Sequence, residues 1–432
     1  MSERSVRIEV PLLARVEGEG ALDLSIRDGQ IEDLRLRIFE PPRLFEKLLE
    51  GRPYTEVPDI VARICGICPV AYQMSAVHAL ERAFRVTVTP WVRAMRRLMY
   101  CGEWIESHAL HIHLLAAPDF FGYDSVIAMA RDYPGEVRRG LRLQALGNEI
   151  IRLLGARSVH PVGVRVGGFH HAPAPESARA LADQLEAALP DARELVRWTA
   201  HFPLPHEEQA VTFVALRHPT EYPMNEGRIV AEGADLDIDA GEFELRFSEV
   251  QVAHSTALHA HLDGQPYLVG ALARINLAGD QLPPEVHETL ADCGVQFPSR
   301  NMFHSVVARA AEIHCALLEA LRLLREYVPV SVPYVPITPR AGEAAWATEA
   351  PRGLLWHRYG VDADGRIRTA RIVPPTSQNQ ARIEQDLRES ITRLGTQRTD
   401  FELRRHAETI IRNYDPCISC ATHFLRLDVK RL

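Results

Sequence analysis

The first forty residues alternate between apolar and polar side chains, with the period of two that is typical of strands with one buried face. Runs of this kind lie within residues 6–38, and the Asp28-Gly29 pair separates the last two of them. An Asp-Gly pair between two alternating runs is a strong signal for a tight hairpin. We therefore expect residues 1–38 to form an antiparallel N-terminal sheet.

After the Pro41-Pro42 break, apolar residues recur three and four positions apart, which places them on one face of a helix. A short amphipathic helix is expected in the segment RLFEKLLEGR, and a proline is well suited to open the helix that follows it. Longer helices are expected from Pro69 to about Phe84, from Pro90 onward, and over residues 136–155, 176–199, 301–327 and 380–394.

Two stretches depart from the helical pattern. Residues 205–275 are richer in β-branched and alternating positions, which predicts strands or loops inserted on the helical body. Residues 329–381 are rich in proline and look irregular, apart from a hairpin signal at residues 361–365. The predicted fold class is therefore α+β, mainly α, with a central bundle of long helices and small flanking β-sheets.

Composition narrows the possible functions. The chain has 432 residues, 46% of them apolar and 25% charged, as in ordinary globular proteins. Its net charge of −8 and the lack of a basic stripe disfavour nucleic acid as a partner. No apolar run approaches the length of a transmembrane segment, and the polar N-terminus does not resemble a signal peptide.

Seven cysteines are present, and four of them form two Cys-x-x-Cys pairs, Cys65 with Cys68 and Cys417 with Cys420. An odd number of cysteines in a large chain, with close pairs, indicates metal or redox chemistry rather than a disulfide framework. It also favours a cytoplasmic location. Each pair supplies two soft thiolate ligands, and together the pairs predict a four-thiolate site for a transition metal.

Several kinds of site share this ligand set. In a structural zinc site the two pairs are normally about 15–20 residues apart, whereas roughly 350 residues separate them here. Two unrelated pairs of buried thiols and a four-thiolate iron–sulfur cluster remain possible. The other three cysteines are isolated and are expected in the core. Because no second redox site or dinucleotide motif is apparent, electrons are expected to leave through a partner subunit.

Two longer motifs surround the cysteine pairs, Arg63-x-Cys65-Gly66-x-Cys68-Pro69 and Asp415-Pro416-Cys417-x-x-Cys420-x-x-His423. With these motifs in this order the chain resembles the large, catalytic subunit of [NiFe]-hydrogenases. The resemblance runs from Ile8 to the C-terminus. It implies a single large-subunit domain over residues 1–423, and a C-terminal extension, residues 424–432, that is removed on maturation.

The resemblance implies a nickel–iron centre that cleaves dihydrogen reversibly and heterolytically into protons and electrons. By motif position, Cys65 and Cys417 would be terminal nickel ligands. Cys68 and Cys420 would bridge the nickel to an iron that also carries carbon monoxide and two cyanides. Soft thiolates suit both metals.

The same resemblance assigns roles to residues outside the cysteine motifs. Glu17, in Arg15-Val16-Glu17-Gly18, would exchange protons with the thiolate of Cys417. Arg352 would lie over the open metal position, oriented by Asp119 and Asp415.

Three more ligand roles follow from the resemblance. The hydroxyl of Thr376 would donate a hydrogen bond to a cyanide. Glu46, His423 and the backbone carbonyl of Ile372 would bind a magnesium ion, which prefers oxygen-rich sites. The segment 160–168 also matches the family and is expected to be structural or to lie at an interface.

The sequence departs from the commonest family pattern at Tyr72, where many members have histidine. The run around it, and Pro-Pro-Thr-Ser-Gln-Asn at residues 374–379, resemble the cytoplasmic NADP-linked group 3b, the sulfhydrogenase type, some of whose members reduce sulfur. The implied partners are a small subunit with Fe–S clusters and flavin-containing diaphorase subunits that bind FAD and NADP(H). Nickel-insertion chaperones and a maturation endopeptidase that cuts after His423 are also implied.

Other interpretations of the sequence remain open. Within the family, the complex could be NAD-linked, deazaflavin-linked or heterodisulfide-linked. A metal-free relative of a respiratory-complex subunit would lack the four cysteines, so their presence argues against it. A zinc scaffold would bind zinc alone, which metal analysis distinguishes from nickel and iron.

Overall fold

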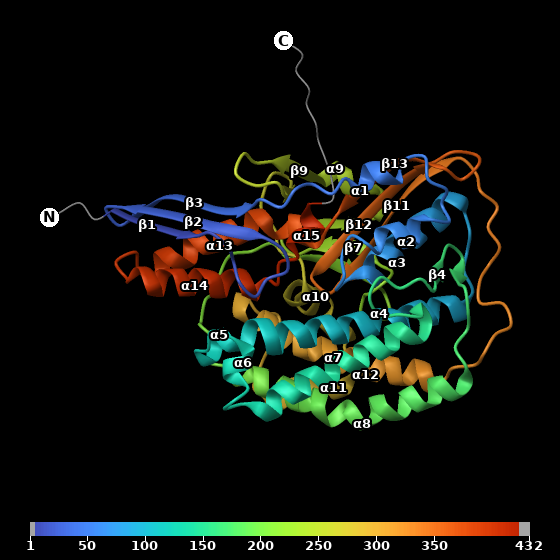
Figure 1. Ribbon diagram of the computed structural model, residues 1–432, viewed down its shortest axis with the longest axis horizontal. Coiled ribbons are helices and arrows are strands. Elements are labelled where there is room, and N and C mark those ends of the chain that lie inside the picture. Colours follow the sequence, from blue (N-terminus) through green and yellow to red (C-terminus); the bar gives the residue numbers. More distant parts are fainter. Residues whose placement is uncertain (1–4, 423–432) are drawn as a thin grey trace, which may run out of the picture.

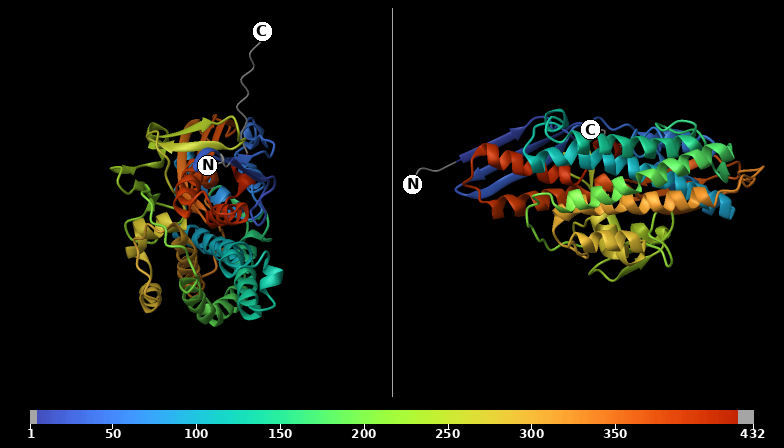
Figure 2. Two further views of the ribbon diagram at one scale, coloured as in Figure 1. Left: turned by 90° about the vertical axis from the view of Figure 1, so that its left-hand side faces the viewer. Right: turned by 90° about the horizontal axis from the view of Figure 1, so that it is seen from below.

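Four long helices form the body of the protein, in a computed structural model that describes residues 5–422. Helices α4 and α7 pack side by side, and α8 and α12 complete the bundle by packing on each other and on α7 and α4. All four run along the longest axis of the molecule (Figures 1 and 2). Most of the small sheets lie on one side of this bundle, above it in Figure 1, together with α1–α3 and α13–α15.

The described α-helices are α1 Phe45–Leu49, α2 Val57–Val61, α3 Pro69–Phe84, α4 Pro90–Leu110, α5 Ala117–Phe121, α6 Val126–Met129, α7 Pro134–Gly155, α8 Pro175–Ala200, α9 Phe243–Arg246, α10 Ala271–Ala278, α11 Pro284–Asp292, α12 Ser305–Arg325, α13 Pro375–Leu394, α14 Asp400–Asn413 and α15 Ile418–Ala421. A π-helical turn, η1 (His111–Ala116), continues α4. Short 3₁₀ turns are η2 Ala240–Glu242, η3 Gly279–Gln281 and η4 Met302–His304.

All strands pair antiparallel in small sheets. The N-terminal sheet has the order β1-β2-β3, and a second three-stranded sheet has the order β11-β12-β13. The strand bounds are β1 Ser5–Val10, β2 Gly20–Arg27, β3 Gln30–Ile38, β4 Val164–Arg165, β5 Gly168–Phe169, β6 Val214–Arg217, β7 Arg228–Ala231, β8 Leu236–Ile238, β9 Phe247–Gln251, β10 Leu258–Leu262, β11 Gly342–Ala350, β12 Gly353–Val361 and β13 Ile367–Val373.

The helix bundle is tight because small residues let two helices approach. A Cβ atom on Gly102 of α4 would lie 2.9 Å from the carbonyl oxygen of Gly147 of α7. A Cβ on Gly147 would lie 2.5 Å from the carbonyl oxygen of Gly102. Any larger side chain at this crossing would push the helices apart, and close packing of the interior makes such shifts costly.

The mainly helical α+β class and the central bundle are confirmed. The N-terminal sheet forms with its predicted hairpin, and the four long bundle helices lie within a few residues of their predicted bounds. The 205–275 stretch contains strands β6–β10, as expected, but also η2, α9 and the start of α10.

The prediction for residues 329–381 was wrong in part. This stretch contains β11, β12 and β13, which form a regular sheet, and the predicted hairpin at 361–365 joins the last two strands. Helix α13 begins at Pro375, five residues before its predicted start, and α14 was not predicted.

Helices α3 and α13 pack on the small sheets beside the segments that carry the two cysteine pairs. Helix α3 packs on β11 and β12, and α13 packs on β3, β10 and α15. In Figure 1 the red C-terminal helices lie against the blue N-terminal sheet. Within residues 5–422, no helix is both long enough and apolar enough to cross a membrane.

Candidate metal centre

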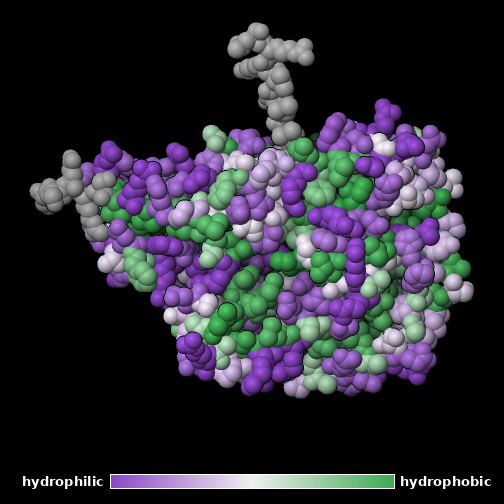
Figure 3. All heavy atoms as spheres, in the orientation of Figure 1, coloured by the Kyte–Doolittle hydropathy of each residue, from purple (hydrophilic) through white to green (hydrophobic). Residues whose placement is uncertain are grey.

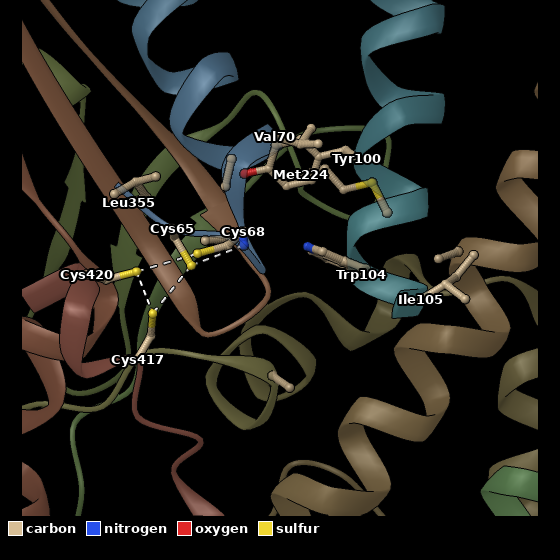
Figure 4. Close-up of a cluster of buried hydrophobic side chains, with 14 of the residues drawn as sticks. Cys65, Cys68, Val70, Tyr100, Trp104, Ile105, Met224, Leu355, Cys417 and Cys420 are labelled. Atoms are coloured by element: carbon tan, nitrogen blue, oxygen red, sulfur yellow. Dashed lines mark hydrogen bonds between the residues drawn. The ribbon is translucent and has the colours of Figure 1, made fainter. Parts of the chain in front are cut away.

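The two cysteine pairs meet in the interior. One sulfur from each of Cys65, Cys68, Cys417 and Cys420 lies within 4.8 Å of the other three. The Sγ atoms of Cys65 and Cys417 are 3.5 Å apart, and those of Cys68 and Cys420 are 3.6 Å apart. Figure 4 shows the pairs facing one another between the loop before α3 and the C-terminal segment. The structure thus assembles the predicted four-thiolate set.

Local backbone geometry favours the thiolate form of Cys65. The backbone N–H groups of Ile67 and Cys68 both lie 3.3 Å from Sγ of Cys65, to which they donate. Hydrogen bonds of this kind stabilise a sulfur anion. Cys68 and Cys417 are the N-caps of α3 and α15, but the first N–H groups of these helices already donate to Glu103 and Glu17.

The sulfur site has the character of a site for a soft metal cation. All four cysteines are at most 4% exposed. Hydrogen bonds from the other thiols lower the pKa of Cys65, whereas burial and the neighbouring sulfurs raise the pKa of Cys417. Four thiolates cannot share this volume without a cation to balance their charge. Soft thiolates bind nickel and iron well, so the donor set fits a nickel–iron centre.

Glu17 lies against the terminal cysteine pair. Its Oε2 atom is 3.1 Å from Sγ of Cys417 and accepts a hydrogen bond from the N–H of Ser419, also at 3.1 Å. Its backbone carbonyl accepts from the N–H of Ile418 at 2.9 Å. A carboxylate in direct contact with a thiol is placed to exchange a proton with it.

Gly18 makes this contact possible. Its φ is +88°, in the left-handed region. A Cβ atom here would lie 2.7 Å from Cβ of Ile418 and 2.6 Å from Oε1 of Glu40. The glycine therefore lets the N-terminal segment lie flat against the segment of Cys417.

Arg352 stands at the tip of the β11–β12 hairpin and is only 3% exposed. Its Nε donates to the backbone oxygen of Asp415 at 2.7 Å, and its Nη2 donates to Oδ1 of Asp415 at 3.0 Å. Burial alone would lower the pKa of Arg352, but the Asp415 carboxylate and the cysteines raise it well above its ordinary value. The guanidinium stays charged, and its buried Nη1 has no partner.

Asp119 pairs with Arg15 and with Arg412, whose Nε lies 2.6 Å from its Oδ2. Arg15 is two residues from Glu17, and Arg412 is three residues before Asp415. Asp119 therefore joins the two segments that carry those acids. Asp415 binds Arg352 directly, whereas the role of Asp119 in orienting Arg352 stays a prediction.

Thr376 contacts the terminal cysteine pair, and two of the predicted magnesium ligands contact each other. Oγ1 of Thr376, on the first turn of α13, accepts a hydrogen bond from the N–H of Cys417 at 3.0 Å. Oε1 of Glu46 accepts from the N–H of Ile372 at 2.7 Å, so two of the three predicted magnesium ligands are neighbours. His423 lies outside the described residues.

Tyr72 is fully buried on α3, and its hydroxyl has no hydrogen-bond partner. Burial, together with the charges of Cys420 and Cys68, raises the pKa of Tyr72 well above its ordinary value. The phenol therefore keeps its proton and can only donate it in a hydrogen bond. The structure places this hydroxyl beside the bridging-type cysteines.

A buried ionic network behind the hairpin was missed from the sequence. Arg274 of α10 donates to Glu312 of α12 and to Glu349 of β11, and all three are fully buried. It also donates to the backbone oxygens of Ala350 and Pro351, which precede Arg352. Burial raises the pKa of Glu349 to about 7 despite the Arg274 charge. The three members of the network lie far apart in the sequence. Charged residues within apolar stretches were the only sequence signal of a buried ionic network.

Glu106 of α4 was also missed. It is 6% exposed, and burial raises its pKa well above the ordinary value, with Arg352 opposing and Cys65 and Asp415 adding to the shift. Glu106 is thus a buried carboxyl group within electrostatic reach of the cysteine site.

Comparison with known proteins matches the description "Nickel-dependent hydrogenase" over residues 43–134. The chain is 34% identical to the sulfhydrogenase 2 subunit alpha of Pyrococcus furiosus, over 97% of this chain and 100% of the relative. It is 28% identical to subunit beta of the NAD-reducing hydrogenase HoxS of Cupriavidus necator, over 98% of this chain and 95% of the relative.

A solved structure is also similar. The crystal structure of an NAD⁺-reducing [NiFe]-hydrogenase in the H₂-reduced state superposes with a TM-score of 0.87 and 27% identity. The match covers 97% of this chain and 99% of that one. Sequence and fold therefore agree along almost the whole chain.

Proposed function

Because the chain belongs to the nickel-dependent hydrogenase family, as the large, catalytic subunit of a group 3 [NiFe]-hydrogenase, we propose that it exchanges the electrons of dihydrogen with NADP(H). The observation that carries the catalytic assignment is the convergence of four buried cysteines with Glu17 in contact with one of them. The enzyme is thus an oxidoreductase acting on dihydrogen.

The four cysteines would hold the metals, with Cys65 and Cys417 on nickel and Cys68 and Cys420 bridging to iron. When bound, the nickel–iron centre supplies the Lewis acidity that polarises dihydrogen for heterolytic cleavage. Carbon monoxide and two cyanides would complete the iron. Residues of the chain would then transfer the proton and stabilise charge around the metals.

Glu17 would move the proton. Its Oε2 lies 3.1 Å from Sγ of Cys417, so a proton on that sulfur passes to the carboxylate without rearrangement of the backbone. The N–H of Ser419 holds the same oxygen in place. Both contacts rest on the short parallel bridge between Glu17 and Cys417.

Arg352 would act by charge and position. Two of its nitrogens are held by Asp415, while the unpartnered Nη1 is left for the site. A guanidinium does not give up its proton at working pH, so it stabilises negative charge rather than transferring protons. Thr376 uses its oxygen as an acceptor for Cys417, which leaves its hydroxyl hydrogen to bind a cyanide.

Glu46, the carbonyl of Ile372 and His423 would bind magnesium next to the end of the chain. The N–H of Arg43 donates to the carbonyl of Thr422 at 2.6 Å, which holds the last described residue beside α1. Residues 1–423 would form the mature single domain, with residues 424–432 removed by an endopeptidase. Intact mass of the active subunit tests this: the expected chain ends at His423, and a chain that keeps residue 432 refutes the cleavage.

Partner subunits would carry the electrons. The relatives are named as subunits alpha and beta. Figure 3 shows hydrophobic residues gathered beneath the N-terminal sheet. Partner subunits would cover this surface. The proposed partners are an Fe–S small subunit and a flavin diaphorase in the cytoplasm. The structural match to an NAD⁺-reducing enzyme makes NAD(H) the second candidate.

Two measurements on the purified complex test the proposal. Infrared spectra are expected to contain carbon monoxide and cyanide bands from iron, and their absence from active enzyme would refute the proposed centre. Dihydrogen-dependent reduction is expected to proceed with a higher kcat/KM for NADP⁺ than for NAD⁺. A higher kcat/KM for NAD⁺ would instead identify NAD(H) as the electron carrier.

A further inference from the structure

A second group of metal-type ligands lies away from the four cysteines. His254 follows β9, His259 is on β10, and Glu384 is on α13. One ligand atom from each of the three residues lies within 4.8 Å of the others. In residues 5–422, this is the one group of three or more such side chains besides the cysteines.

His259 is the most informative member. It is only 3% exposed, and its Nε2 is buried without a hydrogen-bond partner. A buried polar atom without a hydrogen-bond partner destabilises the folded protein. The ring of His254 lies 5.7 Å from the ring of His259, centroid to centroid. A cation between the imidazoles would supply the missing partner.

The other two ligands are held in place by the fold. Nε2 of His254 lies 2.7 Å from Oε1 of Glu384. The same carboxylate oxygen accepts from the backbone N–H of Leu36 on β3, at 2.8 Å. Hydrogen bonds of this kind orient a ligand before a metal arrives. Strand β3 therefore aims the carboxylate toward the histidines.

From this arrangement we propose that His254, His259 and Glu384 bind a divalent transition-metal ion, separate from the cysteine centre. Two imidazoles and one carboxylate suit zinc or ferrous iron, and suit magnesium and calcium poorly because those prefer oxygen. Zinc bonds of about 2.0–2.2 Å place tetrahedral ligands about 3.3 Å apart. Nε2 of His254 and Oε1 of Glu384, now 2.7 Å apart, would therefore separate slightly on binding, and the ion would replace the hydrogen bond between them.

The site is reached from the surface. His254 also lines an open pocket of about 480 Å³, together with Pro42, Gln251 and Thr256. Water from this pocket would fill the fourth position of a tetrahedral ion. The ion would join the middle of α13 to the β9–β10 hairpin, two parts that are distant in the sequence. Helix α13 also carries Thr376 in its first turn.

Zinc is the probe, and the loaded complex is the sample, because nickel and iron then occupy the cysteines. After equilibration with zinc and removal of free ion, the wild-type complex is expected to retain one zinc per large subunit above the His259→Ala complex. Replacing a ligand is expected to weaken zinc binding by about 100-fold or more. His287→Ala, which removes an exposed imidazole on α11, should leave retention unchanged.

Glu384→Gln separates loss of the site from loss of the fold. Glutamine is close in shape and can still accept from Leu36, but it is a poor metal ligand. The proposal requires that Glu384→Gln lose zinc while dihydrogen oxidation and nickel content stay at wild-type values. Equal zinc retention by wild type, His259→Ala and Glu384→Gln would overturn the site, as would zinc loss in His287→Ala to the same extent.

Discussion

At the scale of single residues, the centre depends on charges that are buried and held by named partners. Arg352 and Asp415 are each 3% exposed, and breaking such a buried pair typically costs about 3–5 kcal/mol. Glu17 differs because it is only partly buried and touches sulfur through one oxygen. We therefore propose that Arg352 fixes geometry and that Glu17 carries the mobile proton.

Glu17→Gln is expected to separate proton transfer from metal binding. The amide keeps the shape and can accept from Ser419, but it cannot carry the proton. Nickel and iron content should stay unchanged, while hydrogen–deuterium exchange with solvent falls by about 100-fold or more. Glu19→Gln, an exposed acid two residues away, is the matched control and should exchange normally. Undiminished exchange in Glu17→Gln would remove Glu17 from the relay.

Arg352→Lys tests whether geometry matters beyond charge. Lysine keeps the positive charge but has a single nitrogen. It cannot bind the backbone oxygen and Oδ1 of Asp415 and also direct another nitrogen toward the metal site. Turnover is expected to fall by about 100-fold, the typical effect of losing a preorganised donor, with the metals retained. Arg358→Lys on β12, at a partly exposed position, should keep near wild-type turnover. Equal activity of the two variants would contradict the role of Arg352.

At the scale of elements, strands with one buried face could be predicted from the sequence, whereas fully buried strands could not. Strand β3 buries alternate residues in its second half, so its period was visible in the sequence. Strand β12 is buried at eight of its nine positions, so no alternation marked it as a strand. Helix α14 was overlooked although Thr399 and Glu402 form a capping box at its start.

Gly18→Ala tests how the N-terminal segment supports the cysteine loop. The new methyl group would collide with Ile418 and Glu40 at a positive φ. The variant is expected to assemble with markedly less nickel. Gly51→Ala is the matched control: its φ is +79° and no atom lies within 4 Å of the added Cβ. Gly51→Ala should lose only about 1–2 kcal/mol of folding free energy, the cost of a non-glycine residue in the left-handed region. This control variant should retain nickel. Equal nickel content in both variants would show that the contact is not needed.

At the scale of the whole molecule, the centre joins residues 352 positions apart, Cys65 with Cys417 and Cys68 with Cys420. Motifs predicted the ligands because each pair is local in sequence. They could not reveal the Arg274 network or the His254 cluster, whose members meet only through tertiary packing. The same limit applies to Asp119, whose pairing with Arg15 and Arg412 the motifs did not reveal.

The central claim is that the four cysteines form the nickel–iron site, and metal analysis of the purified, active complex tests it most directly. We expect nickel and iron each close to one per large subunit, after subtraction of the iron in partner clusters. Cys417→Ser should lose nickel and dihydrogen activity together. Zinc alone in the active wild-type complex, or unchanged nickel in Cys417→Ser, would contradict this account.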